Sequence, residues 1–293
     1  GHDLCVLVSD TRYTVQISEE CPGLDVEIRD ARQPMHETVQ RVVMTAGLAR
    51  LGIENHSTSV ATWQQISDSL TSGAKSLELV PVGMLVNELR ATKDAGEIAE
   101  IRKAVTQAQR GFAAVKALLV PEMTELQVAH ELEHLMRQFG AVSAAFEPIV
   151  AVGPRAALPH AHPGPTRLAE SGFVLIDWGA DFQMYRSDLT RILVTGKISP
   201  KLERIYAIVL KAQQQAIKAI RPGAVMKEVD AAARTVIEKA GFGKKFGHSL
   251  GHGIGLDIHE GPRLASGQDR PLKPGMVVTV EPGIYLPGWG GVR

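Results

Sequence analysis

The chain of 293 residues has few cysteines, no long hydrophobic run and no net charge, and each absence excludes a class of protein. Only Cys5 and Cys21 occur, without a CxxC pair, so neither a disulfide scaffold nor a thiolate zinc site is supported. No run reaches the roughly 18 apolar residues of a membrane helix, and no signal-peptide pattern opens the sequence. We therefore expect a reduced, cytoplasmic protein without a membrane partner.

The charges cancel overall but are unevenly distributed. Lys and Arg total 32, as do Asp and Glu, which argues against a nucleic-acid partner and against a disordered polyacidic chain. Residues 1–85 nevertheless contain 6 basic and 11 acidic side chains. Together with the chain length, this asymmetry favours two domains of different character. We place them at residues 1–88 and 89–293, with the boundary near Leu85–Lys93.

The sequence of the first domain predicts alternating strands and helices. Leu4–Val8 predicts a buried strand, residues 37–52 predict a helix that ends at Gly52, and residues 76–85 predict a second strand. Because a chain rarely begins directly with a core strand, we expect that material is missing before Gly1.

The second domain contains two similar helical units. In each, a helix, a proline and a second helix are followed by apolar segments suited to strands. Pro121 precedes Gly140 by 19 residues, and Pro222 precedes Gly241 by the same distance. The expected strands are Ile149–Val152 and Phe173–Ile176 after the first unit and Met276–Val280 after the second. The match predicts a duplicated ααβ unit with a pseudo-twofold axis and a site where the halves meet.

Two aspartates mark the first candidate site. The segment Phe173–Val194 contains two apolar runs around a glycine-containing turn, which is typical of a hairpin. If the turn centres on Phe182 and Gln183, Asp177 and Asp188 face each other across the strands. Opposed like charges destabilise a sheet, so a buried pair would need a shared proton or a cation. The alternative is two exposed aspartates at strand ends.

Three histidines and a glutamate complete the set of candidates. His248, His252 and His259 lie among five glycines, and Glu281 ends an apolar strand just before a Pro-Gly turn. Each could instead be structural or solvated when taken alone, and the glycines match no phosphate-binding motif. Asp, Asp, His and Glu together form an oxygen-rich ligand set that suits Mn²⁺, and with the imidazole also Zn²⁺, Co²⁺ or Fe²⁺. Such carboxylates can bridge two ions about 3.5–4 Å apart and generate a hydroxide nucleophile.

A second metal motif, His130-Glu-Leu-Glu-His134, matches the H-E-x-x-H signature of zinc metalloproteases. The apolar stripe of this helix runs through Val128, Leu132 and Leu135, which turns both histidines toward solvent. No third ligand follows at the required spacing. The motif therefore indicates an amphipathic surface helix.

These segments resemble the pita-bread metallopeptidases, a family that includes Xaa-Pro aminopeptidase, prolidase, methionine aminopeptidase and the metal-free creatinase. The likeness covers about Leu89 to Arg293 and is carried, in the family's order, by Leu158–His160, Ile176–Ala180, Ser187–Arg191, Gly251–Gly255 and Val280–Gly283. Val8–Tyr13 also resembles the creatinase-type N-terminal domain, which favours the proline-specific branch. The resemblance implies an α+β protein. Its catalytic domain at 89–293 has the pita-bread fold, with duplicated ααβ units around a curved antiparallel sheet, and a partial creatinase-like α/β domain at 1–88 precedes it.

The resemblance also implies a dinuclear metal centre. Asp177 would bind one ion through both oxygens, Asp188 would bridge, and His252 and Glu281 would bind the second ion. The implied cofactors are two divalent ions, with manganese preferred over cobalt, zinc or iron. A bridging hydroxide would hydrolyse the Xaa-Pro bond, a tertiary amide with a constrained ring. The implied enzyme is a metallo-exopeptidase, either aminopeptidase P or prolidase, that acts on peptides or dipeptides with proline second and forms a homodimer.

Five residues match the family's supporting roles. Glu281 would also handle the proton of the bridging water. His160 and His259 would steady the tetrahedral intermediate and pass a proton to the leaving proline nitrogen. His248 would line the proline pocket, and Arg293 would support the site through hydrogen bonds.

The family has a fifth ligand, a bridging glutamate two positions beyond the arginine matched by Arg293. The printed sequence stops at Arg293, and residues 282–293 contain no acidic side chain. We interpret both ends as truncated, since a chain complete as printed should bind metal poorly. Two alternatives stay open: a catalytically silent binding module on this fold, and a creatinase-like, metal-free amidine hydrolase.

Overall fold

The computed structural model describes residues 5–71 and 77–293, so the predicted strands at Leu4–Val8 and 76–85 lie partly outside the described residues. The chain divides into two compact units, Gly1–Val86 and Asn87–Arg293. Among the described residues, one hydrophobic core cluster lies in the first unit and two lie in the second. Among the described helices, none combines the length and the apolar composition needed to cross a bilayer.

The N-terminal unit alternates strands and helices. Its elements are β1 (Val6–Asp10), η1 (Thr11–Tyr13), α1 (Thr14–Glu20), β2 (Asp25–Arg29), α2 (Met35–Thr45), β3 (Arg50–Glu54), α3 (Val60–Thr71) and β4 (Glu78–Val82). Strands β1 and β2 pair in parallel, as do β3 and β4. The predicted helix at 37–52 was wrong at its end. Helix α2 stops at Thr45, Gly47 takes a positive φ of 65°, and Gly52 lies within β3. A short helix, α4 (Leu85–Arg90), follows β4.

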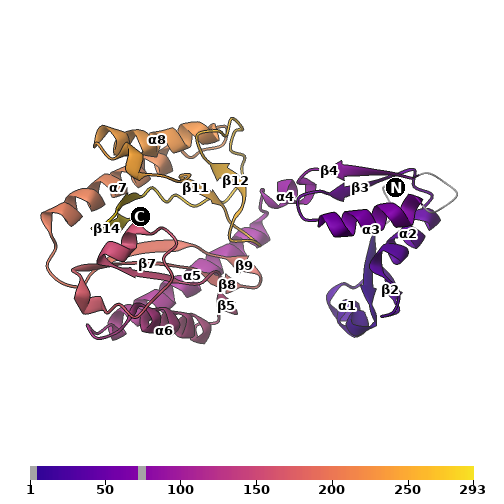
Figure 1. Ribbon diagram of the computed structural model, residues 1–293, viewed down its shortest axis with the longest axis horizontal. Helices are drawn as coiled ribbons and strands as arrows, with labels where there is room; N and C mark the ends of the chain where they lie inside the picture. Colours follow the sequence, from indigo (N-terminus) through magenta and orange to yellow (C-terminus); the bar gives the residue numbers. More distant parts are fainter. Residues whose placement is uncertain (1–4, 72–76) are drawn as a thin grey trace. The chain divides into compact units, whose positions relative to one another are not determined.

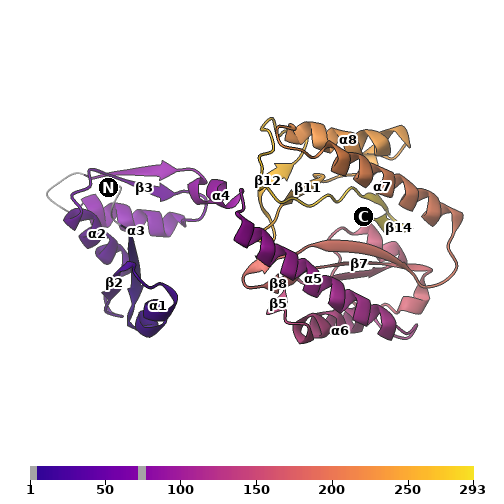
Figure 2. The same cartoon turned by 180° about the vertical axis from the view of Figure 1, so that it is seen from behind.

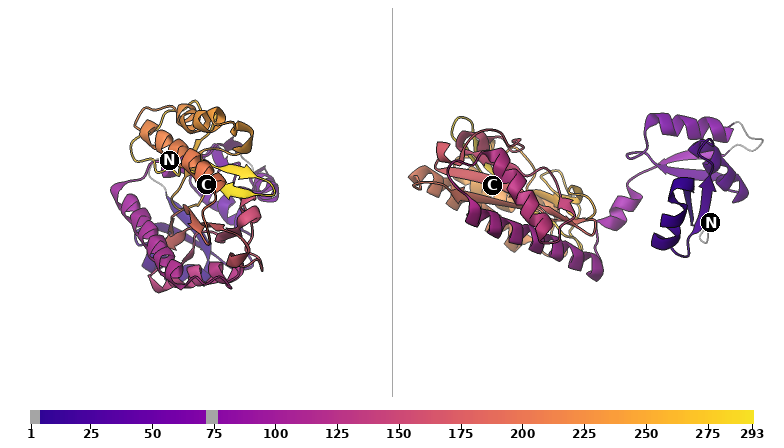
Figure 3. Two further views of the ribbon diagram at one scale, coloured as in Figure 1. Left: turned by 90° about the vertical axis from the view of Figure 1, so that its left-hand side faces the viewer. Right: turned by 90° about the horizontal axis from the view of Figure 1, so that it is seen from below.

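Two pairs of antiparallel helices form the frame of the C-terminal unit (Figure 1). They are α5 (Ala95–Leu118) with α6 (Glu125–Gln138), and α7 (Pro200–Ala219) with α8 (Met226–Lys239). Figures 1 and 2 show the pairs on opposite sides of the strands, and the left view of Figure 3 shows the same separation. The two helix–break–helix units of the sequence are therefore present, and α6 and α8 both have 14 residues.

The strands of the first half form regular antiparallel ladders. Strands β6 (Ile149–Val152), β7 (Phe173–Trp178) and β10 (Leu189–Val194) make one sheet in the order β10-β7-β6. A second sheet contains β5 (Ser143–Ala144), β8 (Ala180–Phe182) and β9 (Tyr185–Arg186). Both expected strands of this half are present, and the short helices η2 (Gly153–Ala157) and η3 (Leu168–Glu170) lie between β6 and β7.

The second half is less regular. It contains η4 (Gly243–Lys245), β11 (Gly251–Gly253), β12 (Glu260–Leu264), β13 (Ile284–Leu286) and β14 (Gly290–Val292). The prediction of a regular strand at Met276–Val280 was wrong. An isolated bridge joins Val278 to Gly253, and a few backbone hydrogen bonds join the neighbouring residues to the β11 region, but they form no continuous ladder. The segment is extended, but its neighbour β11 has only three residues and carries an irregularity in register, which leaves no long ladder to join.

The hairpin between the two aspartates has a different register from the one expected. Its turn centres on Gln183 and Met184, which both have positive φ (51° and 69°), as a two-residue type I′ turn requires. Asp177 therefore pairs with Thr190, two residues beyond Asp188. Because side chains alternate with a period of two, this shift keeps Asp188 on the expected face and makes it a diagonal neighbour of Asp177.

Candidate metal centre

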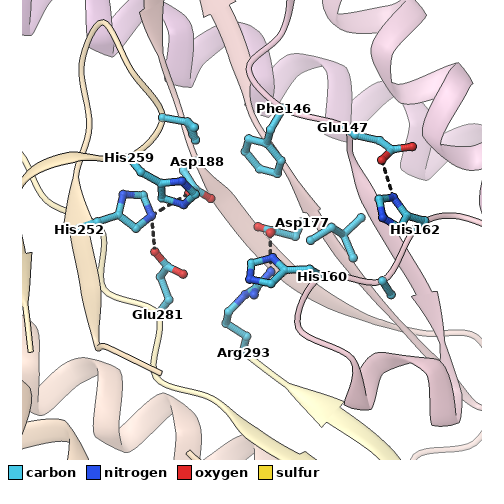
Figure 4. A pocket seen from close by; sticks show the side chains of 13 residues that line it. Phe146, Glu147, His160, His162, Asp177, Asp188, His252, His259, Glu281 and Arg293 are labelled. Carbon is cyan, nitrogen blue, oxygen red and sulfur yellow. Dashed lines mark hydrogen bonds and ion pairs between the residues drawn. The ribbon is translucent and has the colours of Figure 1, made fainter. Parts of the chain in front are cut away.

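Asp188, His252 and Glu281 come together from three separate segments of the C-terminal unit. One ligand atom of each lies within 4.8 Å of the others. His252 Nε2 is 3.0 Å from Glu281 Oε1 and 3.5 Å from Asp188 Oδ2. Figure 4 shows the three side chains converging. Three of the four ligands suggested by the sequence thus form one compact cluster.

Two glycines let the ligand-bearing segments approach closely. A Cβ at Gly179 would collide with the carbonyl oxygen of Ser187, the residue before Asp188. A Cβ at Gly251 would collide in the same way with the carbonyl oxygen of Thr279. Backbone bonds then hold the second pair in place, since Glu281 N donates to Leu250 O at 2.8 Å and Thr279 N donates to His252 O at 2.8 Å.

Asp177, the fourth suggested ligand, lies beside this cluster in an ion pair with Arg293. Thr190 Oγ1 donates to Asp177 Oδ1 at 2.7 Å and accepts from Arg293 Nε at 3.1 Å. Arg293 Nη1 also donates to Pro159 O at 3.3 Å. Arg293 therefore contacts a proposed ligand directly and lines the same cavity.

The centre concentrates negative charge in a mostly buried place. Burial raises the pKa of Asp177 to about 7, with Asp188 adding to the rise while Arg293 and Thr190 oppose it. For His252, burial favours the neutral ring, but hydrogen bonds to Asp188 and Glu281 outweigh it and raise its pKa to about 10. Burial likewise works against the charged form of Glu281, yet contact with His252 keeps its pKa below the usual value. Such a carboxylate cluster is stabilised by added positive charge.

His160 and His259 share a cavity of about 230 Å³ with the four suggested ligands. In Figure 4, His259 lies beside His252 and Asp188, and His160 lies beside Asp177 and Arg293. The ring centroids of His252 and His259 are 4.3 Å apart. Burial lowers the pKa of His259, which favours the neutral imidazole needed to accept a proton.

His248 does not line this cavity. Its Nδ1 lies 2.8 Å from Ser249 O and its Nε2 lies 3.0 Å from the hydroxyl of Tyr285. Burial lowers its pKa. His130 and His134 of the H-E-x-x-H motif are exposed on α6, as the helical periodicity predicted.

Sequence reasoning missed several residues that shape the site. Thr190 holds Asp177, and Thr279 donates to Glu281 Oε1 while accepting from His252 N at 3.0 Å. Thr190 follows Asp188 by two residues, and Thr279 precedes Glu281 by two. In an extended chain such residues share a face, so this spacing could have revealed both threonines. Others line the cavity without any such signal, among them Phe146, Glu147 and His162.

The residues fit a divalent cation. Carboxylate oxygens and one imidazole nitrogen are donors that Mn²⁺ and its neighbours accept. His252 Nδ1 lies 3.0 Å from the carbonyl oxygen of Gly253. A carbonyl oxygen only accepts, so this bond keeps a proton on Nδ1. An ion would take the place of the Nε2 proton, and the Nε2 lone pair, which faces the carboxylates, would then bind the ion.

Comparisons with known proteins identify the family. Residues 99–293 match the model of metallopeptidase family M24, and residues 2–92 match that of the creatinase/prolidase N-terminal domain. The uncharacterized peptidase YqhT of Bacillus subtilis is 40% identical over 292 residues, which cover 99% of this chain and 81% of the relative.

Two solved structures extend the likeness to both units. The Xaa-Pro dipeptidase from Bacillus anthracis superimposes with a TM-score of 0.93 at 38% identity, over 99% of this chain and 80% of its own. The X-Pro aminopeptidase from Thermotoga maritima MSB8 gives 0.87 at 35% identity, over 100% and 82%. The chain therefore belongs to metallopeptidase family M24, and it is an enzyme with the pita-bread fold and the creatinase-like N-terminal domain that the sequence predicted.

Proposed function

We propose that this enzyme hydrolyses the bond between an N-terminal residue and a following proline, with two divalent cations, manganese first among them. The observation that carries this proposal is the cluster of Asp188, His252 and Glu281 beside the buried Asp177, within one cavity. The names of two structural neighbours, an Xaa-Pro dipeptidase and an X-Pro aminopeptidase, support the choice of bond.

Asp177, Asp188, His252 and Glu281 would hold the cations. When bound, such ions supply activated water at neutral pH. Glu281 accepts a hydrogen bond from Thr279 and faces His252, so it has a carboxylate oxygen directed into the cluster that can receive a proton. Its lowered pKa means that it begins the reaction ionised.

His160 and His259 would act on the other side of the bond. Both rings are exposed to the cavity, and neither is a proposed ligand. From these places they can hydrogen-bond the oxyanion that develops on the scissile carbonyl and deliver a proton to the proline nitrogen. A tertiary amide nitrogen leaves only when it is protonated, so a donor on this side is chemically necessary.

The test compares His252→Ala with His130→Ala, which removes an exposed histidine of the H-E-x-x-H motif. We expect His252→Ala to lose manganese at stoichiometric loading and to lower kcat/KM on Ala-Pro and Ala-Pro-Ala by more than the ~100-fold caused by losing an outer-sphere partner. His130→Ala should match the parent. The ratio of the two substrates measures the preference between dipeptides and longer peptides.

Unchanged turnover in His252→Ala would refute the proposed centre. Metal binding without hydrolysis of any Xaa-Pro substrate would favour a silent binding module instead. Equal cleavage of Ala-Ala and Ala-Pro would keep the hydrolase and remove the proline preference. All measurements use the full-length protein.

A further inference from the structure

We propose that Glu125, a fully buried carboxylate at the start of α6, is a positioning residue that fixes the loop carrying His160. The inference rests on the function proposed above, because it assigns Glu125 a task in that reaction. Glu125 touches neither the cavity nor any proposed ligand, and no motif of the sequence pointed to it.

Glu125 binds both ends of one loop. Its Oε1 accepts from Val152 N at 2.8 Å, where β6 ends, and its Oε2 accepts from Gly164 N at 2.9 Å, where the loop returns to α6. His160 lies between these two anchors. One carboxylate therefore sets the distance between the two ends of the segment that presents His160 to the cavity.

Arg155 completes the arrangement. Its Nε donates to both oxygens of Glu125, at 3.0 and 2.8 Å, and its Nη2 donates to the carbonyl oxygen of His162 at 2.6 Å. Arg293 also binds this loop, through Pro159 O. The backbone on both sides of His160 is thus held by guanidinium groups, one anchored on Glu125 and the other on Asp177.

The burial of Glu125 makes this arrangement rigid. Its side chain has no exposed surface, and every partner is a donor: two backbone amides and a guanidinium. Hydrogen bonds to a buried charge are stronger than neutral ones, and an unpaired buried donor is costly, so the loop has one favoured position. Glu125→Gln keeps the shape but places an NH₂ group against donors, which should release one end of the loop.

A matched pair on α8 serves as the control. Asp230 is also buried, and it forms a bidentate ion pair with Arg234, whose Nη1 and Nη2 donate to the carbonyl oxygens of Phe246 and His248. Asp230 also accepts from Leu250 N at 3.2 Å. This pair holds the segment leading to His252, so Asp230→Asn should disturb cation binding, whereas Glu125→Gln should not.

The experiment is a double-mutant cycle of Glu125→Gln with His160→Ala, read out as kcat and KM on Ala-Pro together with manganese affinity by titration. We expect Glu125→Gln to lower kcat by about 10–100-fold at unchanged KM, the scale for a misplaced group. In the His160→Ala background it should cause little further loss, because its effect passes through His160. Manganese affinity should stay at the parent value in Glu125→Gln and fall in Asp230→Asn.

Additive losses in the cycle would overturn the proposal, as would weaker manganese binding in Glu125→Gln. If Glu125→Gln does not fold, Arg155→Lys takes its place, since it retains the charge but loses the forked contacts to Glu125 and His162. The two proposals can fail separately. Inactivity of the parent refutes the function, whereas an active parent with an additive cycle refutes only the role of Glu125.

Discussion

The two halves of the C-terminal unit position their candidate ligands with the same types of residue. In each half a glycine lets the two backbone segments that carry candidate ligands approach closely. Gly179 does so in the first half and Gly251 in the second. Each also has a threonine that donates to a ligand carboxylate and accepts from an N–H group, Thr190 in the first and Thr279 in the second. The duplication seen in the helices thus reaches the contacts that hold the site.

The halves differ in the secondary structure that carries the ligands. In the first half Asp177 lies in a six-residue ladder between β7 and β10. In the second, His252 lies in a three-residue strand and Glu281 follows a segment joined to its neighbour by scattered bonds. The first half can rely on its ladder for geometry, whereas the second depends on individual contacts. A mutation that weakens one of these contacts should therefore lower metal affinity more in the second half than in the first.

The largest expected effect comes from the two glycines. Gly179→Ala and Gly251→Ala each push a Cβ into a backbone carbonyl, which cannot move without separating the ligand segments. We expect each to destabilise the protein by about 3 kcal/mol, the upper end for overpacking, and to lower the Tm by ~6–12 °C. Manganese affinity should fall further in Gly251→Ala, because the short strand β11 offers less resistance to displacement.

Gly247→Ala is the control for this pair. It lies in the same glycine-rich segment, but apart from its chain neighbours no heavy atom lies within 4 Å of its added Cβ. Its Tm and manganese affinity should equal those of the parent. A loss in Gly247→Ala as large as in Gly251→Ala would show that the segment needs flexible backbone in general, and equal losses of affinity at Gly179 and Gly251 would remove the difference between the halves.

The threonines should produce a smaller effect. Thr190→Val and Thr279→Val keep the shape but remove a hydrogen bond to a ligand carboxylate, a change that typically costs 10–100-fold in metal affinity. We expect the loss to be greater for Thr279→Val, since Asp177 keeps Arg293 after its threonine is gone. Titration with manganese measures both, and a greater loss for Thr190→Val would contradict the comparison.

The sequence predicted the parts that depend on local patterns. Matched spacings revealed the helical units of both halves, and apolar runs revealed β6 and β7. The ligand cluster followed from residue chemistry and from the family resemblance. The prediction of a regular strand at Met276–Val280 was wrong, because an apolar run becomes a strand only where a partner strand from elsewhere in the chain pairs with it.

Two features could not be read from local sequence. The buried Glu125 begins an ordinary amphipathic helix, and its role depends on Val152 and Gly164, which lie 27 and 39 residues away. The hairpin register depended on which two residues adopt positive φ, and Gln183 and Met184 carry no signal for it, since neither is Gly, Asn or Asp.

The smallest effect concerns the turn between β8 and β9 in the first half, where two non-glycine residues, Gln183 and Met184, have positive φ. Met184 is 71% exposed and has a φ of 69°, a conformation that costs a non-glycine residue about 1–2 kcal/mol. Met184→Gly removes this strain and loses about 0.5–1 kcal/mol to backbone entropy, so we expect a net gain of ~0.5–1 kcal/mol and a Tm higher by roughly 1–3 °C. Because the ladder between β7 and β10 already sets the register, manganese affinity should not change. A gain in affinity would instead mean that the turn limits how Asp177 and Asp188 are spaced, and the first half would then depend on local contacts as much as the second.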